Sequence, residues 1–182
     1  MTDPLGHTST FSYDQIGNLV TSTDPLGHQT TFSYNGVGQP ASVTDALSHT
    51  VQFGYFGGDL VSVTDPLGNV STQVTDPVGR VITSTDALGN TARSQYSPLN
   101  LLTQVTDPQG HNTAFSYDAN GNLLTLTDPL NHTTTYTYDN MDRTLTRTDP
   151  LNRQERYSYD LNGNLVSSTD RKGQVTSSPT IL

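Results

Sequence analysis

Short runs in which apolar and polar residues alternate cover the chain, and turn-forming residues separate these runs. From His111 to Tyr117, Phe115 and Tyr117 fall on one side of the alternation, and small or polar residues fall on the other. This period of two predicts a β-strand with an aromatic face and a polar face. A second alternating run, Asn122–Thr127, predicts a second strand. No segment keeps a 3.6-residue period over helical length, so we expect an all-β protein.

The segments between the runs predict tight turns. Asp107-Pro108-Gln109-Gly110 has Asp at the first, Pro at the second and Gly at the fourth position, which are the preferences of a type I turn. A second turn is expected at Asp118-Ala119-Asn120-Gly121. The asparagines that replace the glycine at Asn131 and Asn152 also tolerate a positive φ. Each unit is therefore predicted to be two strands joined by two Asp-led turns.

This unit recurs throughout the chain with a period of 21 residues, broken by one interval of 20. The regularity predicts an array of about eight β-hairpin units that form a curved or spiralling antiparallel sheet. About 16 strands are expected, and open twisted sheets of more than ~10 strands usually curl or close. We expect residues 1–182 to form one array. Its units start near Asp3, Asp24, Asp45, Asp65, Asp86, Asp107, Asp128 and Asp149, and a partial unit starts at Asp170.

Aromatic residues recur at two fixed positions of the first strand in each unit. On a strand they share one face, so we expect an aromatic ladder that stabilises the sheet through cross-strand contacts. The residues of this predicted structural ladder are Phe11, Tyr13, Phe32, Tyr34, Phe53, Tyr55, Tyr96, Phe115, Tyr117, Tyr136, Tyr138, Tyr157 and Tyr159. The same rings could instead stack sugar rings or line a cavity that holds an unfolded chain.

Three units depart from the pattern. The fourth has Gln73 at the first aromatic position and no Tyr at the second, and the fifth has Ser94 at the first. These departures predict a weak point or a bend around residues 73–96. The third unit is one residue short at Phe56-Gly57-Gly58, which predicts a tighter turn.

Composition excludes several classes of function. The net charge is -9, and Glu155 is the only glutamate among 17 acidic residues. An Asp-rich surface repels phosphate backbones, so no nucleic-acid partner is expected. The absence of cysteine excludes a disulfide framework and thiolate chemistry. No apolar run has the length of a membrane span, so no membrane insertion is expected.

Candidate chemistry at the repeated polar positions is weak. All five histidines follow the first turn of a unit: His7, His28, His49, His111 and His132. A histidine column could bind a transition metal, and the turn aspartates could bind calcium. Asn or Arg occupies the same position in other units, however, and turn capping explains the aspartates without an ion. Every combination of Ser, His and Asp is repeated, so we expect no catalytic residues, no metal, no cofactor and no enzyme activity.

The repeated motif resembles the YD repeat of the RHS family. It is seen from Gly6 to Leu19 (GHTSTFSYDQIGNL), from Gly110 to Leu123 (GHNTAFSYDANGNL) and, with Asn for the leading Gly, from Asn152 to Leu165 (NRQERYSYDLNGNL). The family includes bacterial RHS polymorphic toxins, components of insecticidal toxin complexes and animal teneurins. The resemblance implies a spiralling β-sheet shell that encloses a toxin domain or other cargo. Nothing in the chain matches the self-cleaving segment that often closes such shells.

The leading functional hypothesis is a structural scaffold, part of an RHS-type shell that encapsulates or presents a toxin in a secreted or cell-surface protein. Because Met1 is already in repeat phase with no signal peptide before it, we expect a segment of a larger bacterial protein. A self-assembling fibre subunit that pairs through open sheet edges is one alternative. A carbohydrate-binding module is the other. The expected partners are other repeats of the same or identical chains, and either an encapsulated toxin or a glycan.

Overall fold

The structure is a computed structural model, and it describes residues 2 and 6–177. In this part of the chain every regular element is a β-strand, and every pair of neighbouring strands with a defined register is antiparallel. The all-β repeat fold predicted from the alternation is therefore confirmed. The chain divides into two compact parts, which we call the N-terminal half (Met1–Thr91) and the C-terminal half (Ala92–Leu182). The boundary falls within the range 73–96, where the repeat motif is least regular. Asp3, the first expected unit start, lies outside the described residues.

The N-terminal half is a meander of short strands, each hydrogen-bonded to the next along the chain. Its strands are β1 (Thr10–Tyr13), β2 (Leu19–Thr23), β3 (Gln29–Tyr34), β4 (Pro40–Thr44), β5 (Thr50–Phe56), β6 (Asp59–Thr64), β7 (Val70–Thr75) and β8 (Val81–Thr85).

The C-terminal half has the same arrangement and contains all but the first residue of β9. Its strands are β9 (Thr91–Tyr96), β10 (Leu102–Thr106), β11 (Asn112–Tyr117), β12 (Leu123–Thr127), β13 (Thr133–Tyr138), β14 (Thr144–Thr148), β15 (Gln154–Tyr159), β16 (Leu165–Thr169) and β17 (Val175–Ser177).

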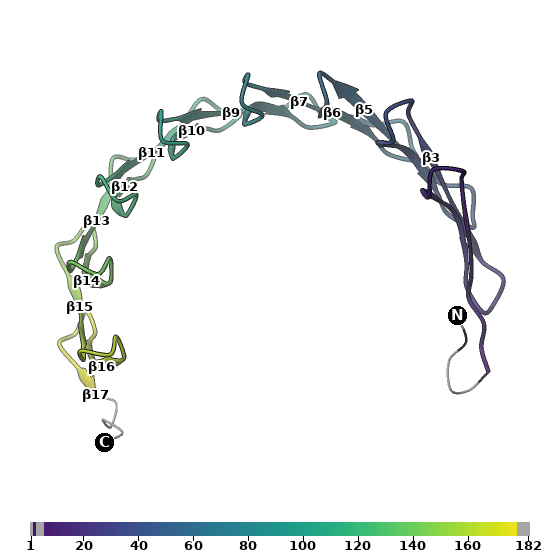
Figure 1. Cartoon of the computed structure of the whole chain (residues 1–182). Helices are drawn as coiled ribbons and strands as arrows, with labels where there is room; N and C mark the ends of the chain where they lie inside the picture. Colours follow the sequence, from purple (N-terminus) through teal and green to yellow (C-terminus); the bar gives the residue numbers. More distant parts are fainter. Residues whose placement is uncertain (1, 3–5, 178–182) are drawn as a thin grey trace. The chain divides into compact units, whose positions relative to one another are not determined.

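Each half, taken by itself, is a single curved layer of strands with no second layer against it (Figure 1). Among the described residues no hydrophobic side chain is buried. In residues 2 and 6–177, Thr134 and Asp149 alone are buried, with 8% and 5% of their surface exposed. Most strand residues are half-buried by their neighbours in the sheet. Stability must therefore come from cross-strand contacts and from the turns, because the strands that the structure describes enclose no packed interior.

Fifteen of the connections are the same three-residue hairpin loop. In the Asp107 turn, the Gly110 amide donates to the Asp107 carbonyl (3.0 Å), and the Asp107 amide donates to the His111 carbonyl (2.9 Å). Gly110 has φ 87°, so the loop is a type I turn closed by a left-handed residue. Asn131 and Asn152 occupy that place with φ 64° and 60°. The predicted type I turns and the tolerance for Asn are both confirmed.

The two hairpins of each unit differ in register. The hairpin that follows an even-numbered strand is regular, as between β12 and β13, where Thr125 and Thr127 face Thr135 and Thr133. The hairpin that follows an odd-numbered strand has a bulge, as between β11 and β12, where Ser116 faces Thr125 but Tyr117 faces Leu123. The same shift recurs in each described odd-to-even pair. Bulges bend a strand and increase its twist, which accounts for a sheet that curves within each half.

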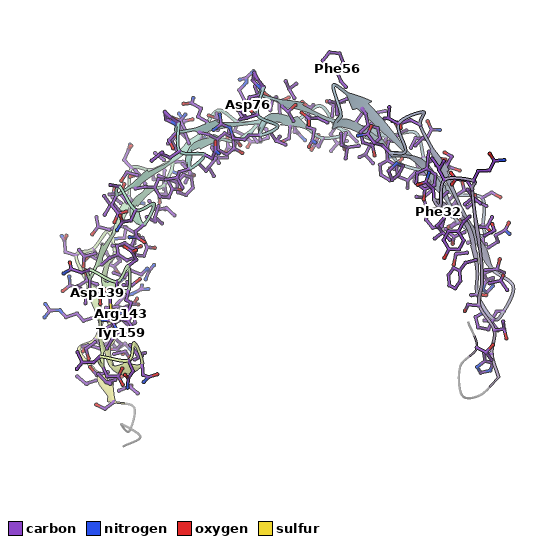
Figure 2. All side chains as sticks on the ribbon, viewed as in Figure 1. Phe32, Phe56, Asp76, Asp139, Arg143 and Tyr159 are labelled. Atoms are coloured by element: carbon purple, nitrogen blue, oxygen red, sulfur yellow. The ribbon has the colours of Figure 1, made fainter. Side chains whose placement is uncertain are left out.

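The short third unit has the tighter turn expected from its length. Phe56 pairs with Asp59 across Gly57 and Gly58, whose φ angles are 62° and 99°. Two positive φ values define a type I′ turn, which closes a hairpin with two residues instead of three. Phe56 stands at this tip, 82% exposed, and projects away from the strands (Figure 2).

The polar face carries rows of paired hydroxyl groups. Ser116 and Thr125 lie 2.6 Å apart across the bulged hairpin, and Thr127 and Thr133 lie 2.9 Å apart across the next strand pair. Because these groups bond to one another, the paired hydroxyls are hydrogen-bonded without a further partner. No helix in the described residues is long and apolar enough to cross a membrane.

Candidate binding face

The aromatic residues of each unit gather on one surface of the sheet, which we call the aromatic face. The register places an even-numbered strand between successive aromatic strands. Phe115 therefore faces Leu126, and Tyr136 faces Arg147. Equivalent aliphatic partners elsewhere include Val43, opposite Phe32.

The residues of the predicted ladder are all on odd-numbered strands. They lie on β1 (Phe11, Tyr13), β3 (Phe32, Tyr34), β5 (Phe53, Tyr55), β9 (Tyr96), β11 (Phe115, Tyr117), β13 (Tyr136, Tyr138) and β15 (Tyr157, Tyr159). Their exposure varies along the chain. Phe11 and Tyr13 on β1 are 46% and 60% exposed, whereas Phe115 and Tyr117 are half-buried.

The second aromatic position is tyrosine because its hydroxyl links one unit to the preceding one. Tyr117 donates to the Leu102 carbonyl (2.8 Å), and Tyr138 donates to the Leu123 carbonyl (2.9 Å). The same bond is made by Tyr34 to Leu19 (2.9 Å) and by Tyr159 to Thr144 (3.0 Å). Each acceptor is the first residue of a bulged strand. A bulge disrupts the ladder locally, and the tyrosine supplies a donor there.

The fourth unit keeps this bond although it lacks the tyrosine. Its Thr75 occupies the tyrosine position and its Gln73 the first aromatic position, since they face Val81 and Ser84 as Tyr117 and Phe115 face Leu123 and Leu126. Gln73 Nε2 donates to the Leu60 carbonyl (2.6 Å), and Leu60 pairs with Tyr55 as Leu102 pairs with Tyr96. A glutamine thus supplies the donor that the sequence pattern had removed.

What glutamine does not supply is the volume of a ring. A depression of about 280 Å³ lies over this part of the sheet, and its walls include Leu60, Val61, Val63, Gln73 and Ser84. It is the place where the row of aromatic residues is interrupted. The aromatic face of the N-terminal half therefore has an apolar hollow at its least regular repeat.

Side chains at the loops also link neighbouring units. Asn122 Nδ2 donates to Asp142 Oδ1 (2.6 Å), and Arg143 Nη1 donates to the Asp160 carbonyl (3.1 Å). The Arg143 guanidinium also covers the Tyr159 ring at 4.8 Å from its centroid (Figure 2). All these contacts join bulged hairpins that are one repeat apart.

The turn aspartates act as caps of their own loops. In the Asp118 turn, Oδ1 accepts the amides of Asn120 (2.9 Å) and Asn122 (2.8 Å), while Oδ2 accepts the Asn122 side chain (2.9 Å). The Asn122 side-chain bond is the leading cause that holds the pKa of Asp118 below its ordinary value. The repeated Asp is therefore explained by loop closure.

The histidines occupy the donor position of this cap. His28 Nδ1 lies 2.9 Å from Asp24 Oδ2, and this bond is the leading cause that lowers the pKa of Asp24. His49, His111 and His132 make the same contact with their turn aspartates. In the described residues no group of three potential metal ligands comes together.

The turn that starts at Ser97 lacks both the aspartate at its first position and the side-chain donor at its fifth position. Where the first residue is Ser97, the fifth is Leu101, which has no side-chain donor. Ser97 Oγ still accepts the amides of Leu99 and Leu101, both at 3.2 Å. The loop thus keeps its backbone cap, and the donor is lost together with the carboxylate that it would serve.

Sequence comparison supports the resemblance noted above. The family described as RHS Repeat matches residues 1–29, 13–50, 76–114, 117–154 and 142–175, which is well over half of the chain. This chain belongs to the RHS repeat family. The residues that no RHS repeat match covers include 51–75, which contain the Gly57-Gly58 turn and Gln73. No curated protein matches the sequence.

Solved structures with the same fold come from toxin complexes. A chain of a mutated Photorhabdus luminescens Tc holotoxin pore is 14% identical with a TM-score of 0.63, and the match covers 90% of this RHS repeat chain and 12% of that chain. TcdB2-TccC3 without its hypervariable C-terminal region is 17% identical with a TM-score of 0.56, and the match covers 89% of this chain and 11% of that chain. At this identity the likeness shows the fold. The chain spans about one eighth of the length of these proteins.

Sequence reasoning missed a group of charged residues on the aromatic face of the C-terminal half. Arg147, Glu155 and Arg171 lie close together there, whereas the positions equivalent to Arg147 in other RHS repeats hold Ser, Val or Leu. The signal was available as a departure from the repeat.

Proposed function

We propose that this RHS repeat array is a structural segment of a scaffold that encloses or presents a polypeptide toxin within a larger secreted or cell-surface protein. The observation that carries the proposal is the uncovered aromatic face. Units held together by Tyr-to-carbonyl bonds and capped turns form a single layer, and the face with rings and aliphatic side chains has no cover of its own. A sheet with one apolar face is stable in contact with a second layer.

A second observation supports contacts with further parts of a larger assembly. The middle residue of most three-residue hairpin loops is a large apolar residue that points into solvent, with Leu67 and Leu88 both 88% exposed. Rows of exposed apolar side chains mark interaction sites. These loop residues are Ile16, Leu26, Val37, Leu47, Leu67, Val78, Leu88, Leu99, Leu130, Met141 and Leu151. The partners we propose are other repeats of the same or identical chains, and an enclosed toxin.

We further propose that residues 1–182 act as one array and that its aromatic residues stabilise it. The register supports this, since each ring packs against the side chain of the following strand. We propose no enzyme activity. The histidine and aspartate side chains that could take part in catalysis are engaged in capping turns, and each such pair is repeated. A glycan partner is not proposed, because several phenol hydroxyls that would bond a sugar already donate to carbonyls.

Electron microscopy of the full-length parent protein tests the proposal. We expect a hollow particle whose wall contains this segment, and we expect the cargo inside to resist added protease until the wall is opened. A solid or extended particle, or cargo that is cut as fast as when it is free, would contradict the scaffold proposal. Sedimentation of the isolated segment separates the fibre alternative, which requires polymers that grow with concentration.

A further inference from the structure

The last two complete repeats carry a cluster that sets them apart from the rest of the array. Six of the eight basic residues of the chain lie between Arg143 and Lys172. Within this stretch, Arg147 replaces the Ser, Val or Leu of other repeats, and Tyr136 and Tyr157 replace phenylalanine. Changes that gather in space at equivalent repeat positions indicate a local role that the other units do not share.

These residues surround a depression on the aromatic face. Its volume is about 380 Å³, and its walls are Tyr136, Thr144, Arg147, Tyr157, Tyr159 and Leu165. Tyr136 and Arg147 face each other across β13 and β14, and Tyr157 and Tyr159 lie two residues apart on β15. The hollow thus has three aromatic rings, one aliphatic side chain and one guanidinium.

Most polar groups in the hollow are already bonded. The Tyr157 hydroxyl donates to Glu155 Oε2 (3.2 Å), and the Tyr159 hydroxyl donates to the Thr144 carbonyl (3.0 Å). Tyr136 bonds to Arg147, which is the leading cause that raises the pKa of Arg147. What a ligand can still reach is the surface of the rings and the N–H groups of Arg147 that are not engaged.

The ion-pair network beside the hollow carries a net positive charge. Glu155 receives Arg147 (3.4 Å) and Arg171 (2.7 Å), and Arg171 is the leading cause that lowers the pKa of Glu155. Two guanidinium groups against one carboxylate leave a surplus of one positive charge. Asp149 belongs to the same network, because it pairs with Arg153 at 2.7 Å and with Arg171 at 3.6 Å. Three guanidinium groups against two carboxylates still leave one positive charge in this network. The rest of the chain is acidic, so the surplus is distinctive.

We propose that this depression, the Tyr136–Leu165 pocket, binds an acidic peptide segment that places a carboxylate on Arg147 and an aromatic or proline side chain against Tyr157 and Tyr159. Ring faces suit a flat apolar side chain, and an arginine suits a carboxylate. A sugar would need several donors and acceptors that the hollow does not offer. The proposal does not depend on the scaffold function, since it concerns the pocket alone.

Titration of the chain with an end-blocked peptide, Gly-Ser-Glu-Phe-Glu-Gly-Ser, tests the proposal by NMR of labelled tyrosine rings. Shifts are expected at Tyr136, Tyr157 and Tyr159, and not at Tyr34. Peptides with Lys for Glu, or with Ala for Phe, should bind more weakly. Equal shifts with the lysine peptide, shifts centred elsewhere, or none at millimolar peptide would each overturn the proposal.

Substitution of the arginine gives the sharper test. Arg147→Leu should weaken binding about tenfold, as loss of a hydrogen bond to a charged group does. Leucine already occupies the equivalent position at Leu126, so the sheet should tolerate it. Arg93→Leu on β9 is the matched control for the lost charge, and it should leave binding unchanged.

A second variant covers the case in which Arg147→Leu does not fold. Glu155→Gln removes the carboxylate that competes for both guanidinium groups, so the acidic peptide should bind more tightly, by about threefold. Weaker or unchanged binding in this variant, or equal effects of Arg93→Leu and Arg147→Leu, would contradict the assignment of Arg147.

Discussion

The hairpin β11–β12 and the hairpin β7–β8 solve the same problem with different residues. In the first, the Tyr117 hydroxyl reaches the Leu102 carbonyl beside the ring of Phe115. In the second, Thr75 and Gln73 hold these two positions, and the amide of Gln73 reaches the Leu60 carbonyl. The donor is retained and the rings are lost. The comparison teaches that a residue other than tyrosine can donate the hydrogen bond to the bulge of the preceding repeat, whereas the ring fills space that can be left open.

Removal of the whole tyrosine should have the largest effect. Tyr117→Ala deletes a half-buried ring together with the donor, and we expect a loss of about 2–4 kcal/mol in the free energy of unfolding. Urea unfolding measures it. Thr75→Ala is the matched variant, since it removes a hydroxyl that donates to Asp59 Oδ2 (2.7 Å) and has no ring to lose. A cost for Tyr117→Ala no greater than for Thr75→Ala would show that the ring contributes nothing.

Removal of the donor alone should cost the same in both hairpins. Tyr117→Phe and Gln73→Leu each leave a carbonyl without its partner and keep most of the side-chain volume. We expect a loss of about 1 kcal/mol for each in urea unfolding, which is typical of one hydrogen bond. A neutral Gln73→Leu beside a costly Tyr117→Phe would mean that Gln73 does not replace the tyrosine.

Restoration of the motif at Gln73 and Thr75 should stabilise the N-terminal half. The double variant Gln73→Phe, Thr75→Tyr provides both the ring and the hydroxyl, and it fills the depression of about 280 Å³. We expect a gain of about 1 kcal/mol, because cross-strand aromatic pairs contribute on that order. Thermal unfolding followed by circular dichroism checks the sign. The single variant Gln73→Phe should gain less, since the Leu60 carbonyl then has no donor.

Acid should separate the turns by their caps. Hydrogen bonds from the neighbouring asparagine side chain are the leading cause of the lowered pKa of Asp118 and of Asp160. A lowered pKa in the folded state stabilises the fold above the ordinary aspartate range, and this contribution is lost as the pH falls through the folded pKa. The Ser97 turn has no carboxylate. Amide exchange at Asn122 should therefore quicken on acidification relative to exchange at Leu101, and equal changes would contradict the cap.

The sequence predicted the hairpins and the loops because these depend on neighbours along the chain. Alternation defined the strands, and Asp, Pro and Gly defined the turns at Asp107 and Asp118. The Tyr117-to-Leu102 bond joins residues 15 apart and depends on the register shift of a bulge, which no local pattern reveals. The compensating role of Gln73 was hidden for the same reason, and the cluster around Arg147 exists only because separate strands bring its members together.

The alternation of regular and bulged hairpins sets the step in which such a protein can change its length. Loss of a single strand and its loop would pair two strands of the same kind and leave a tyrosine without its carbonyl, whereas loss of both hairpins would restore every partner. Duplication and deletion in the gene should therefore survive in multiples of 21 codons. The 20-residue unit is an allowed exception, because the Gly57-Gly58 turn shortens the loop and keeps the bulge between Gly54 and Tyr55 in place.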